Sequence, residues 1–295
     1  MNDFVLIVIS ALGLASLYFI LASGLSLIFG LMRVLTFAHG CFLTLSAYVA
    51  WLVVREFESA STGMLLIGVV AAIAAGGLIS LVTELLVIRP LKGKELEQLL
   101  ATVGISVAVV ALIQGTWGPD QHLVEVPAWL RESTGILGTD IPNIRLVLIA
   151  AAVAVLIAIK VLLGRTRYGL VVRAGVENAE MVSALGIDVQ RSFTVMFTIG
   201  GLLAGFGGAL TAMYYRGVTP LMGDDLLIFA FIALIVGGLG SIDGAAIAAV
   251  GLALAQSLAN FYIDSGAGDI VIVLLMVVTL LVRPQGLLGQ KERLA

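Results

Sequence analysis

Charge is scarce in this chain of 295 residues, because Asp, Glu, Lys and Arg together make up only 12% of it. Hydrophobic residues make up 60%, and the mean hydropathy of +1.14 lies far above that of a soluble globular domain. The formal net charge is −3, which argues against a nucleic acid as a partner. The composition excludes a soluble domain and predicts an integral membrane protein.

Cysteine and histidine are also rare, with one Cys and two His in the whole chain. Cys41 has no partner for an internal disulfide, and His39 and His122 fall in different predicted segments, which does not support a histidine-rich metal site. The phosphate-binding pattern G-x-x-x-x-G-K-[ST] is missing, since the Gly-Lys pair at 93–94 is followed by glutamate. We expect no catalytic residue, no metal and no cofactor on this chain.

Long apolar runs fill most of the sequence, and about 20 such residues suffice for a helix to cross a bilayer core of about 30 Å. They predict an all-α polytopic membrane protein of about eight to nine transmembrane or half-membrane helices, as one domain over residues 1–295. The first run is a span rather than a cleavable signal, because the chain lacks a basic start. The predicted spans are Phe4–Leu31, Val34–Val54, Met64–Ile88, Leu99–Trp117, Leu146–Leu163, Phe193–Tyr215, Leu226–Val236, Ala245–Tyr262 and Ile270–Val282.

The run Leu226–Val236 is too short to span alone, because its 11 residues cover about half of the hydrocarbon thickness. A glycine-rich stretch, Gly237–Gly244, follows it and predicts a broken helix, either as two tight helices or as a re-entrant pair. In transporters, such breaks expose backbone groups to a polar solute. Close helix packing is the other interpretation of membrane glycines.

The distribution of Lys and Arg predicts the orientation. With the N-terminus outside, twelve of the sixteen basic residues fall in inner loops, as the positive-inside rule requires. The C-terminus and the segment 164–191 are then cytoplasmic, and the segment 118–145 is a periplasmic loop. That loop carries Trp129 and three prolines, which suits either a docking surface or a solvated connector.

The segment Gly164–Arg191 is the most polar interruption between two apolar runs. Its middle, Val176–Leu185, predicts a short helix that ends with Gly186 as a left-handed cap. Glu177 and Glu180 favour the start of that helix, where the macrodipole is positive. Three residues at spacing i, i+3 and i+4 make one small apolar face that a soluble partner could bind: Met181, Ala184 and Leu185.

Four groups of motifs follow one another along nearly the whole chain. They are Gly24-Leu25-Ser26-Leu27-Ile28-Phe29-Gly30 with Met32-Arg33-Val34 and Phe37-Ala38-His39-Gly40; Arg167-Tyr168-Gly169 with Arg173-Ala174, Glu177-Asn178 and Leu185-Gly186-Ile187; Gly237-Gly238-Leu239-Gly240-Ser241 with Gly244-Ala245; and Arg283-Pro284-Gln285-Gly286-Leu287-Leu288-Gly289. In this order they resemble the branched-chain amino acid ABC transporter permeases, in particular the LivH type.

The resemblance implies a permease subunit of an importer for branched-chain amino acids in the bacterial inner membrane. It implies four kinds of partner: a second, LivM-like permease, two cytoplasmic ATPases that bind ATP and Mg, a periplasmic solute-binding protein, and membrane lipid. The residues expected to couple to the ATPases are Arg173, Glu177, Asn178, Glu180, Met181, Leu185 and Gly186. The residues expected to line the translocation path are Gly30, Phe37, His39, Gly40, Gly237, Gly238, Gly240 and Ser241.

Three positions depart from the family pattern: Thr36, where members usually have Asn, Cys41, where an acid is frequent, and Asp243, where Pro is common. Urea, short amides or another small solute therefore stay open as substrates. An ion-coupled secondary transporter would need ionisable residues at mid-membrane, whereas nearly all charge here lies at the ends of spans. A passive channel would need a ring of selectivity groups, and none is readable.

Other polar and small residues in the spans have structural interpretations. Glu84 is expected to form a local ion pair with Arg89 or Lys92. His39 is expected either to bond a neighbouring helix or to line the path. The small residues of Gly200–Gly208 predict a packing face that could meet the partner permease.

Overall fold

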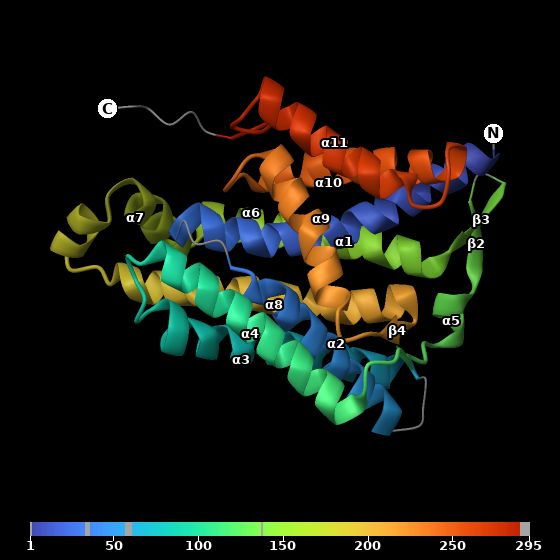
Figure 1. Ribbon diagram of the computed structural model, residues 1–295, viewed down its shortest axis with the longest axis horizontal. Helices are drawn as coiled ribbons and strands as arrows, with labels where there is room; N and C mark the ends of the chain where they lie inside the picture. The colour runs from blue at the N-terminus through green and yellow to red at the C-terminus, as the bar shows by residue number, and fades with distance from the viewer. Residues whose placement is uncertain (1, 33–35, 57–60, 137, 290–295) are drawn as a thin grey trace.

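Helices form nearly all of the structure, and the long ones lie side by side along its longest axis (Figure 1). The computed structural model describes residues 2–32, 36–56, 61–136 and 138–289. Seven of the helices described are long and apolar enough to cross a membrane, which confirms the predicted all-α polytopic class. The helices are α1 (Asn2–Met32), α2 (Ala38–Glu56), α3 (Thr62–Thr83), the π-helical turn η1 (Glu84–Ile88), α4 (Glu95–Trp117), α5 (Ala128–Arg131), α6 (Asn143–Arg165), α7 (Arg167–Ala184), α8 (Val189–Tyr215), α9 (Met222–Gly237), α10 (Ile242–Tyr262) and α11 (Ala267–Val282).

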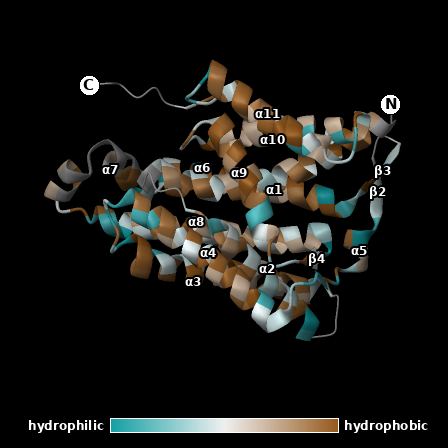
Figure 2. Cartoon of the chain, in the orientation of Figure 1, coloured by the Kyte–Doolittle hydropathy of each residue, from teal (hydrophilic) through white to brown (hydrophobic). Residues whose placement is uncertain are grey.

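The two ends of the helix bundle differ (Figure 1). One, the α7 end, carries α7. The other, the hairpin end, carries α5 and four short strands: β1 (His122–Leu123), β2 (Ser133–Ile136), β3 (Thr139–Pro142) and β4 (Gly217–Val218). β1 pairs with β4 and β2 pairs with β3, both antiparallel. The segment 118–145 therefore contains regular secondary structure, namely β1, α5, β2 and β3. Apolar residues cover the helix shafts, and hydrophilic residues are plentiful at the hairpin end (Figure 2).

The core lies where α1, α2 and α8 meet, because these helices bury most of their residues, whereas α4 and α6 leave most of theirs exposed. Glycines let α3 and α8 approach closely. A methyl group on Gly76 would collide with the Gly201 carbonyl oxygen, and one on Gly205 would collide with the Ala72 carbonyl oxygen. The predicted packing face on α8 is thus confirmed. Its contacts lie within the same chain, so the expectation that it meets a partner permease is wrong.

Most helix boundaries differ from the sequence prediction by a few residues, and the starts of α2 and α9 matter most for the candidate site. α2 begins at Ala38 rather than Val34, and residues 33–35 lie outside the described part of the chain. α9 has 16 residues and begins at Met222, so it includes two aspartates in its first turn, where a helix dipole favours negative charge. The turn Gly238–Ser241 separates α9 from α10, with Gly238 at φ 105° and Gly240 at φ 80°. The predicted break in the helix is therefore confirmed, and the choice between two tight helices and a re-entrant pair stays a prediction.

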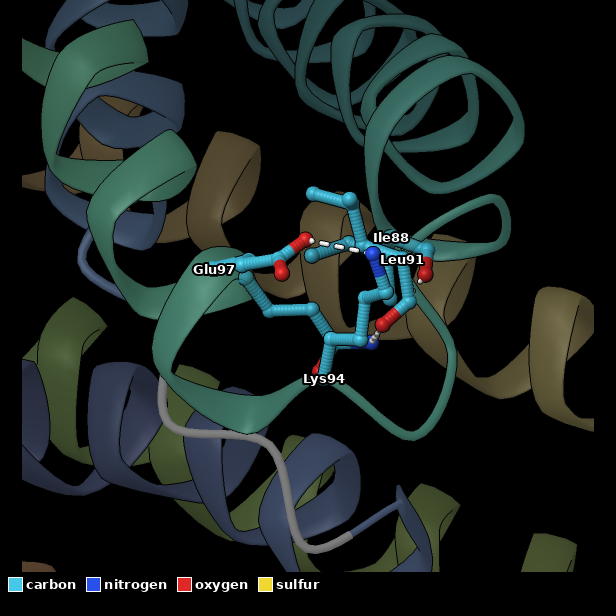
Figure 3. Close-up of polar contacts among 5 residues, drawn as sticks. Ile88, Leu91, Lys94 and Glu97 are labelled. Carbon is cyan, nitrogen blue, oxygen red and sulfur yellow. Dashed lines mark hydrogen bonds and ion pairs between the residues drawn. The ribbon is translucent and has the colours of Figure 1, made fainter.

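Polar contacts close the turn between η1 and α4 at the α7 end (Figure 3). The Gln98 amide nitrogen donates to the Ile88 carbonyl at 3.1 Å and to the Leu91 carbonyl at 3.0 Å. Lys94 and Glu97 form an ion pair at 3.1 Å. Because the last carbonyls of a helix have no partner within it, Gln98 supplies donors that the turn needs and fixes the end of η1 against α4.

Candidate functional site

α7 is longer than the sequence predicts, since it covers Arg167–Ala184 rather than Val176–Leu185. Thr166 begins the helix, because its hydroxyl oxygen accepts a hydrogen bond from the Gly169 amide at 3.1 Å, the geometry of an N-cap. The helix continues through Gly169 and Gly175. Glycine suits both positions, because each lies where a side chain would be too close to a neighbour. The neighbour is the end of α6 at Gly169 and the start of α8 at Gly175.

The helix α7 ends as predicted, with Gly186 after it in the left-handed region at φ 78°. The Ile187 amide donates to the Val182 carbonyl at 3.4 Å, which is the six-to-one bond of a Schellman motif. Asp188 then caps α8 by accepting from the Arg191 amide at 2.9 Å. A short capped connection thus joins α7 directly to a membrane-length helix.

The apolar residues of α7 divide between two environments. Val182 is buried in a cluster with Val189 and Phe193 of α8. Met181 and Leu185 leave 63% and 74% of their surfaces exposed. The exposed apolar face predicted at the end of α7 is therefore present. The side chains of four other predicted coupling residues lie outside the described part of the structure: Arg173, Glu177, Asn178 and Glu180.

Glu84 joins α3 to the start of α8. It is fully buried, and its Oε1 accepts a hydrogen bond from the Gln190 amide at 3.1 Å. Lys92 donates to Gln190 at 3.0 Å and so reaches Glu84 only through that side chain. The predicted local ion pair with Arg89 or Lys92 is wrong, because the widened π turn begins at Glu84 and carries its side chain into the bundle.

The glycines predicted to line the path lie at close contacts between helices. A methyl group on Gly30 would lie 2.9 Å from the α-carbon of Gly240, and one on Gly237 would collide with the backbone of Gly244. Ser241 caps α10, since its hydroxyl accepts from the Gly244 amide at 3.1 Å. These contacts favour the packing interpretation for this set, and a path role stays a prediction.

The C-terminal tail binds the last turn of α9, which brings two of the sequence motifs together. The amides of Leu287 and Leu288 donate to the carbonyls of Val236 and the residue after it, at 2.8 and 3.0 Å. Gly238 and Gly286 touch so closely that neither has room for a side chain. The tail therefore supplies donors to carbonyls that the end of α9 leaves without intrahelical partners.

His39 and Gly40 lie in the first turn of α2, deep in the bundle. The His39 ring lies against Gly24 of α1, close to the backbone of Leu21 in the same helix, and a hydrogen bond from this ring to α1 stays a prediction. A methyl group on Gly40 would lie 2.9 Å from the Gly223 carbonyl oxygen of α9. The Gly223 amide in turn donates to Thr44 at 3.0 Å. These contacts fix the start of α9 against α2.

The sequence reasoning missed Asp224, an acidic residue inside the bundle. Its Oδ1 accepts a hydrogen bond from Ser106, at the middle of α4, at 3.0 Å. Phe37 lies near it in the fold, with its ring 5.4 Å from the Phe231 ring of the same helix α9. The available signal was an acidic pair placed directly before the apolar run Leu226–Val236.

An open cavity of about 560 Å³ lies at the hairpin end. Trp51 and His122 stack in it with ring centroids 4.6 Å apart, and the Arg55 guanidinium lies 5.1 Å from the Trp51 ring. Glu125 also lines it, so the cavity presents both signs of charge. At the α7 end, Lys160 and Asp243 form an exposed ion pair at 2.6 Å beside the α9–α10 turn.

Comparison with known proteins gives one consistent result. The model of a family described as "branched-chain amino acid transport system / permease component" matches residues 7–280. The high-affinity branched-chain amino acid transport system permease protein LivH of Escherichia coli is 28% identical over 289 residues, which cover 95% of this chain and 93% of the relative. The corresponding BraD protein of Pseudomonas aeruginosa is 26% identical over 294 residues, or 96% and 95%.

An archaeal relative agrees with these two. The probable branched-chain amino acid transport permease protein LivH of Methanocaldococcus jannaschii is 27% identical over 290 residues, which cover 93% of this chain and 89% of the relative. No solved structure gives a significant match. The matches cover the seven membrane-length helices, as expected of a multi-pass inner-membrane protein. The resemblance seen in the motifs is confirmed, and the chain belongs to the family of permease components of branched-chain amino acid transport systems.

Proposed function

We propose that the chain is the translocation subunit of an ATP-binding-cassette importer for branched-chain amino acids. It would assemble with a second, similar permease, two cytoplasmic ATPases that bind ATP and Mg, and a periplasmic solute-binding protein. The observation that carries this proposal is α7, a helix at one end of the bundle with exposed Met181 and Leu185. The names of the relatives support the solute class.

The contacts of α7 suggest how ATPase movement reaches the membrane helices. We place the α7 end in the cytoplasm, where an ATPase would bind the face at Met181 and Leu185. A push on α7 then passes to α8 through the cluster of Val182 with Phe193. It passes on to α3 through the hydrogen bond between Gln190 and Glu84. Rigid, packed helices transmit such displacements over long distances.

The hairpin end would then face the periplasm and receive the solute-binding protein. Its strands and α5 give the segment 118–145 a fixed backbone, which suits a docking surface better than a solvated connector does. The cavity lined by Arg55 and Glu125 offers both signs of charge to a docking protein.

Replacing Leu185 by glutamate tests the coupling role. A charge on the docking face should prevent burial of that face, because an unpaired buried charge costs several kcal/mol. We expect the Leu185→Glu chain to reach the membrane at the normal level but to lose most of its co-purifying ATPase. Its rate of solute uptake should fall at least about tenfold. Leu123→Glu is the control for ATPase co-purification alone, since Leu123 is 78% exposed at the opposite end, where the solute-binding protein rather than the ATPase would dock. Normal ATPase recovery and uptake with Leu185→Glu would refute the coupling role.

An ion-coupled transporter is the second candidate, because Asp224 and Glu84 place ionisable groups inside the bundle. The two functions differ in their energy source. Vesicles that contain the chain with its second permease, its ATPases and the solute-binding protein should take up leucine only when ATP is supplied on the side of the ATPases. Uptake driven by a proton or sodium gradient, with the chain alone, would favour the second candidate.

A further inference from the structure

We propose that Asp224 binds the ammonium group of the transported amino acid, at a site formed by α4, α9 and the first turn of α2. The proposal rests on the proposed function and adds a chemical reason for the solute class. A zwitterionic amino acid offers an ammonium group, a carboxylate and a side chain. The three elements around Asp224 provide a partner for each of them.

Asp224 is partly buried, and its contact with Ser106 places it beside the middle of α4. Ser106, which donates to it at 3.0 Å, is eleven residues from each end of α4. A methyl group on Gly40 would lie 3.0 Å from Asp224 Oδ1, so the start of α2 is equally close. No basic side chain pairs with Asp224 among the residues that the structure describes. An acidic side chain at such a depth faces water or protein rather than lipid and is by default a candidate for function.

An apolar surface continues from Asp224 along α9. Ile228 and Phe231 follow at spacings of four and seven residues, which places all three on one face of the helix. Ile228 is 59% exposed, and Phe37 packs on Phe231. This surface suits the branched aliphatic side chain of leucine, isoleucine or valine.

The first turn of α2 supplies the partner for the carboxylate. The Phe37 amide donates to Thr102 of α4 at 3.3 Å, which places that turn against the same face of α4 as Ser106, one helical turn away. The N-terminal amides and the positive end of the dipole favour an anion there. Thr36, directly before this turn, is fully buried, and its side-chain oxygen has no hydrogen-bond partner in the described part of the chain, which makes it a candidate ligand for the carboxylate.

A structural role for Asp224 is the competing explanation, since it is the third residue of α9 and there favours the helix dipole. The next residue allows the two roles to be separated. Asp225 lies in the same turn and carries the same charge, but it is exposed. Asp225→Asn therefore removes one charge from the same helix end without touching the contact to Ser106.

The first experiment measures leucine uptake by the assembled transporter, with its partner subunits and binding protein. Asp224→Asn should lower uptake by roughly ten- to a hundredfold, the size of a hydrogen bond to a charged group. Asp225→Asn should change it by about twofold or less, and Asp224→Glu should recover part of the activity. Membrane insertion and ATPase co-purification should be normal in all three. Equal effects of Asp224→Asn and Asp225→Asn would overturn the proposal.

The second experiment locates the solute without the binding protein. In the complex of the two permeases and the ATPases, Ile228→Cys places a thiol one turn from Asp224, while the natural Cys41 is fully buried. Leucine and leucinamide should slow labelling of this thiol by a water-soluble methanethiosulfonate. The analogue 4-methylpentanoate, which lacks the ammonium group, should not. Leu123→Cys, which is exposed at the hairpin end when the binding protein is omitted, controls for effects on the reagent. Equal protection by leucine and 4-methylpentanoate, or no protection by either, would overturn the proposal.

The two proposals fail in different ways. If the unmodified transporter imports urea or a short amide and no branched-chain amino acid, the proposed function is wrong and the ammonium site falls with it. If it imports leucine but Asp224→Asn behaves like Asp225→Asn, only the ammonium site is wrong.

Discussion

Single glycines decide how closely helices of this chain approach. Gly205 of α8 faces the Ala72 carbonyl of α3, whereas nothing lies within 4 Å of the corresponding side-chain position at Gly104 of α4. We predict that Gly205→Ala destabilises the protein by about 1–3 kcal/mol, because overpacking forces the two helices apart. Gly104→Ala should be neutral or stabilising by about 0.5–1 kcal/mol, because alanine fixes a helix better than glycine.

Thermal unfolding of the two variants in the same lipid nanodiscs checks this pair. Both substitutions add one methyl group to a membrane helix, so a difference between them reports the packing contact alone. A similar unfolding midpoint for both variants would contradict the close contact between α3 and α8.

Local rules predicted some features of the candidate sites and could not predict others. The cap at Gly186 and the exposed face at Met181 and Leu185 follow from spacing within about ten residues, and the structure agrees. Asp224 and Glu84 are different, because their surroundings come from distant segments. Ser106 lies 118 residues from Asp224, and Gln190 lies 106 residues from Glu84. No periodicity within one helix contains such contacts.

At the scale of elements, the bilayer makes helices easy to predict and their ends difficult. A span needs about 20 apolar residues, so the seven long helices could be read from hydropathy. The polar start of α7 could not, because the cap at Thr166 and the tight contact at Gly169 depend on how α6 and α7 pack. The strands β1 and β4 escaped prediction for the same reason, since they pair across almost one hundred residues of chain.

The tail after α11 is an element whose role only the structure reveals, and it yields a prediction. Leu287→Pro removes the amide that donates to the Val236 carbonyl at 2.8 Å. We expect a loss of about 1–3 kcal/mol of stability, because a carbonyl at the end of α9 is left without a partner. Hydrogen exchange in the last turn of α9 should also become faster.

Leu287→Ala is the control for this change. It keeps the amide donor and shortens a side chain that is already 39% exposed, so it should behave almost as the unmodified chain. If the proline and alanine variants exchanged hydrogen at the same rate, the tail would not hold the end of α9.

At the scale of the whole molecule, the surfaces of the chain suit a subunit of a larger assembly. The outer faces of α4 and α6 are largely exposed, which suits contact with lipid or with a second permease. The α7 end offers an apolar docking face, and the hairpin end offers a cavity with charges of both signs. Asp224 lies between these two surfaces, so the proposed solute site is placed where alternating access from the two ends would be needed.

The orientation of these two ends in the membrane is the last prediction. The sequence assigns twelve of the sixteen basic residues to predicted inner loops, and the positive-inside rule then places the α7 end in the cytoplasm. Single cysteines at Leu185 and Leu123 report the two ends, because both positions are largely exposed and Cys41 is buried. In cells with a permeabilised outer membrane, an impermeant maleimide should label Leu123→Cys at once. It should label Leu185→Cys only after the inner membrane is broken and the docked ATPases are removed. The opposite pattern would place α7 outside the cell, where no ATPase can drive it, and would refute the coupling mechanism together with the orientation.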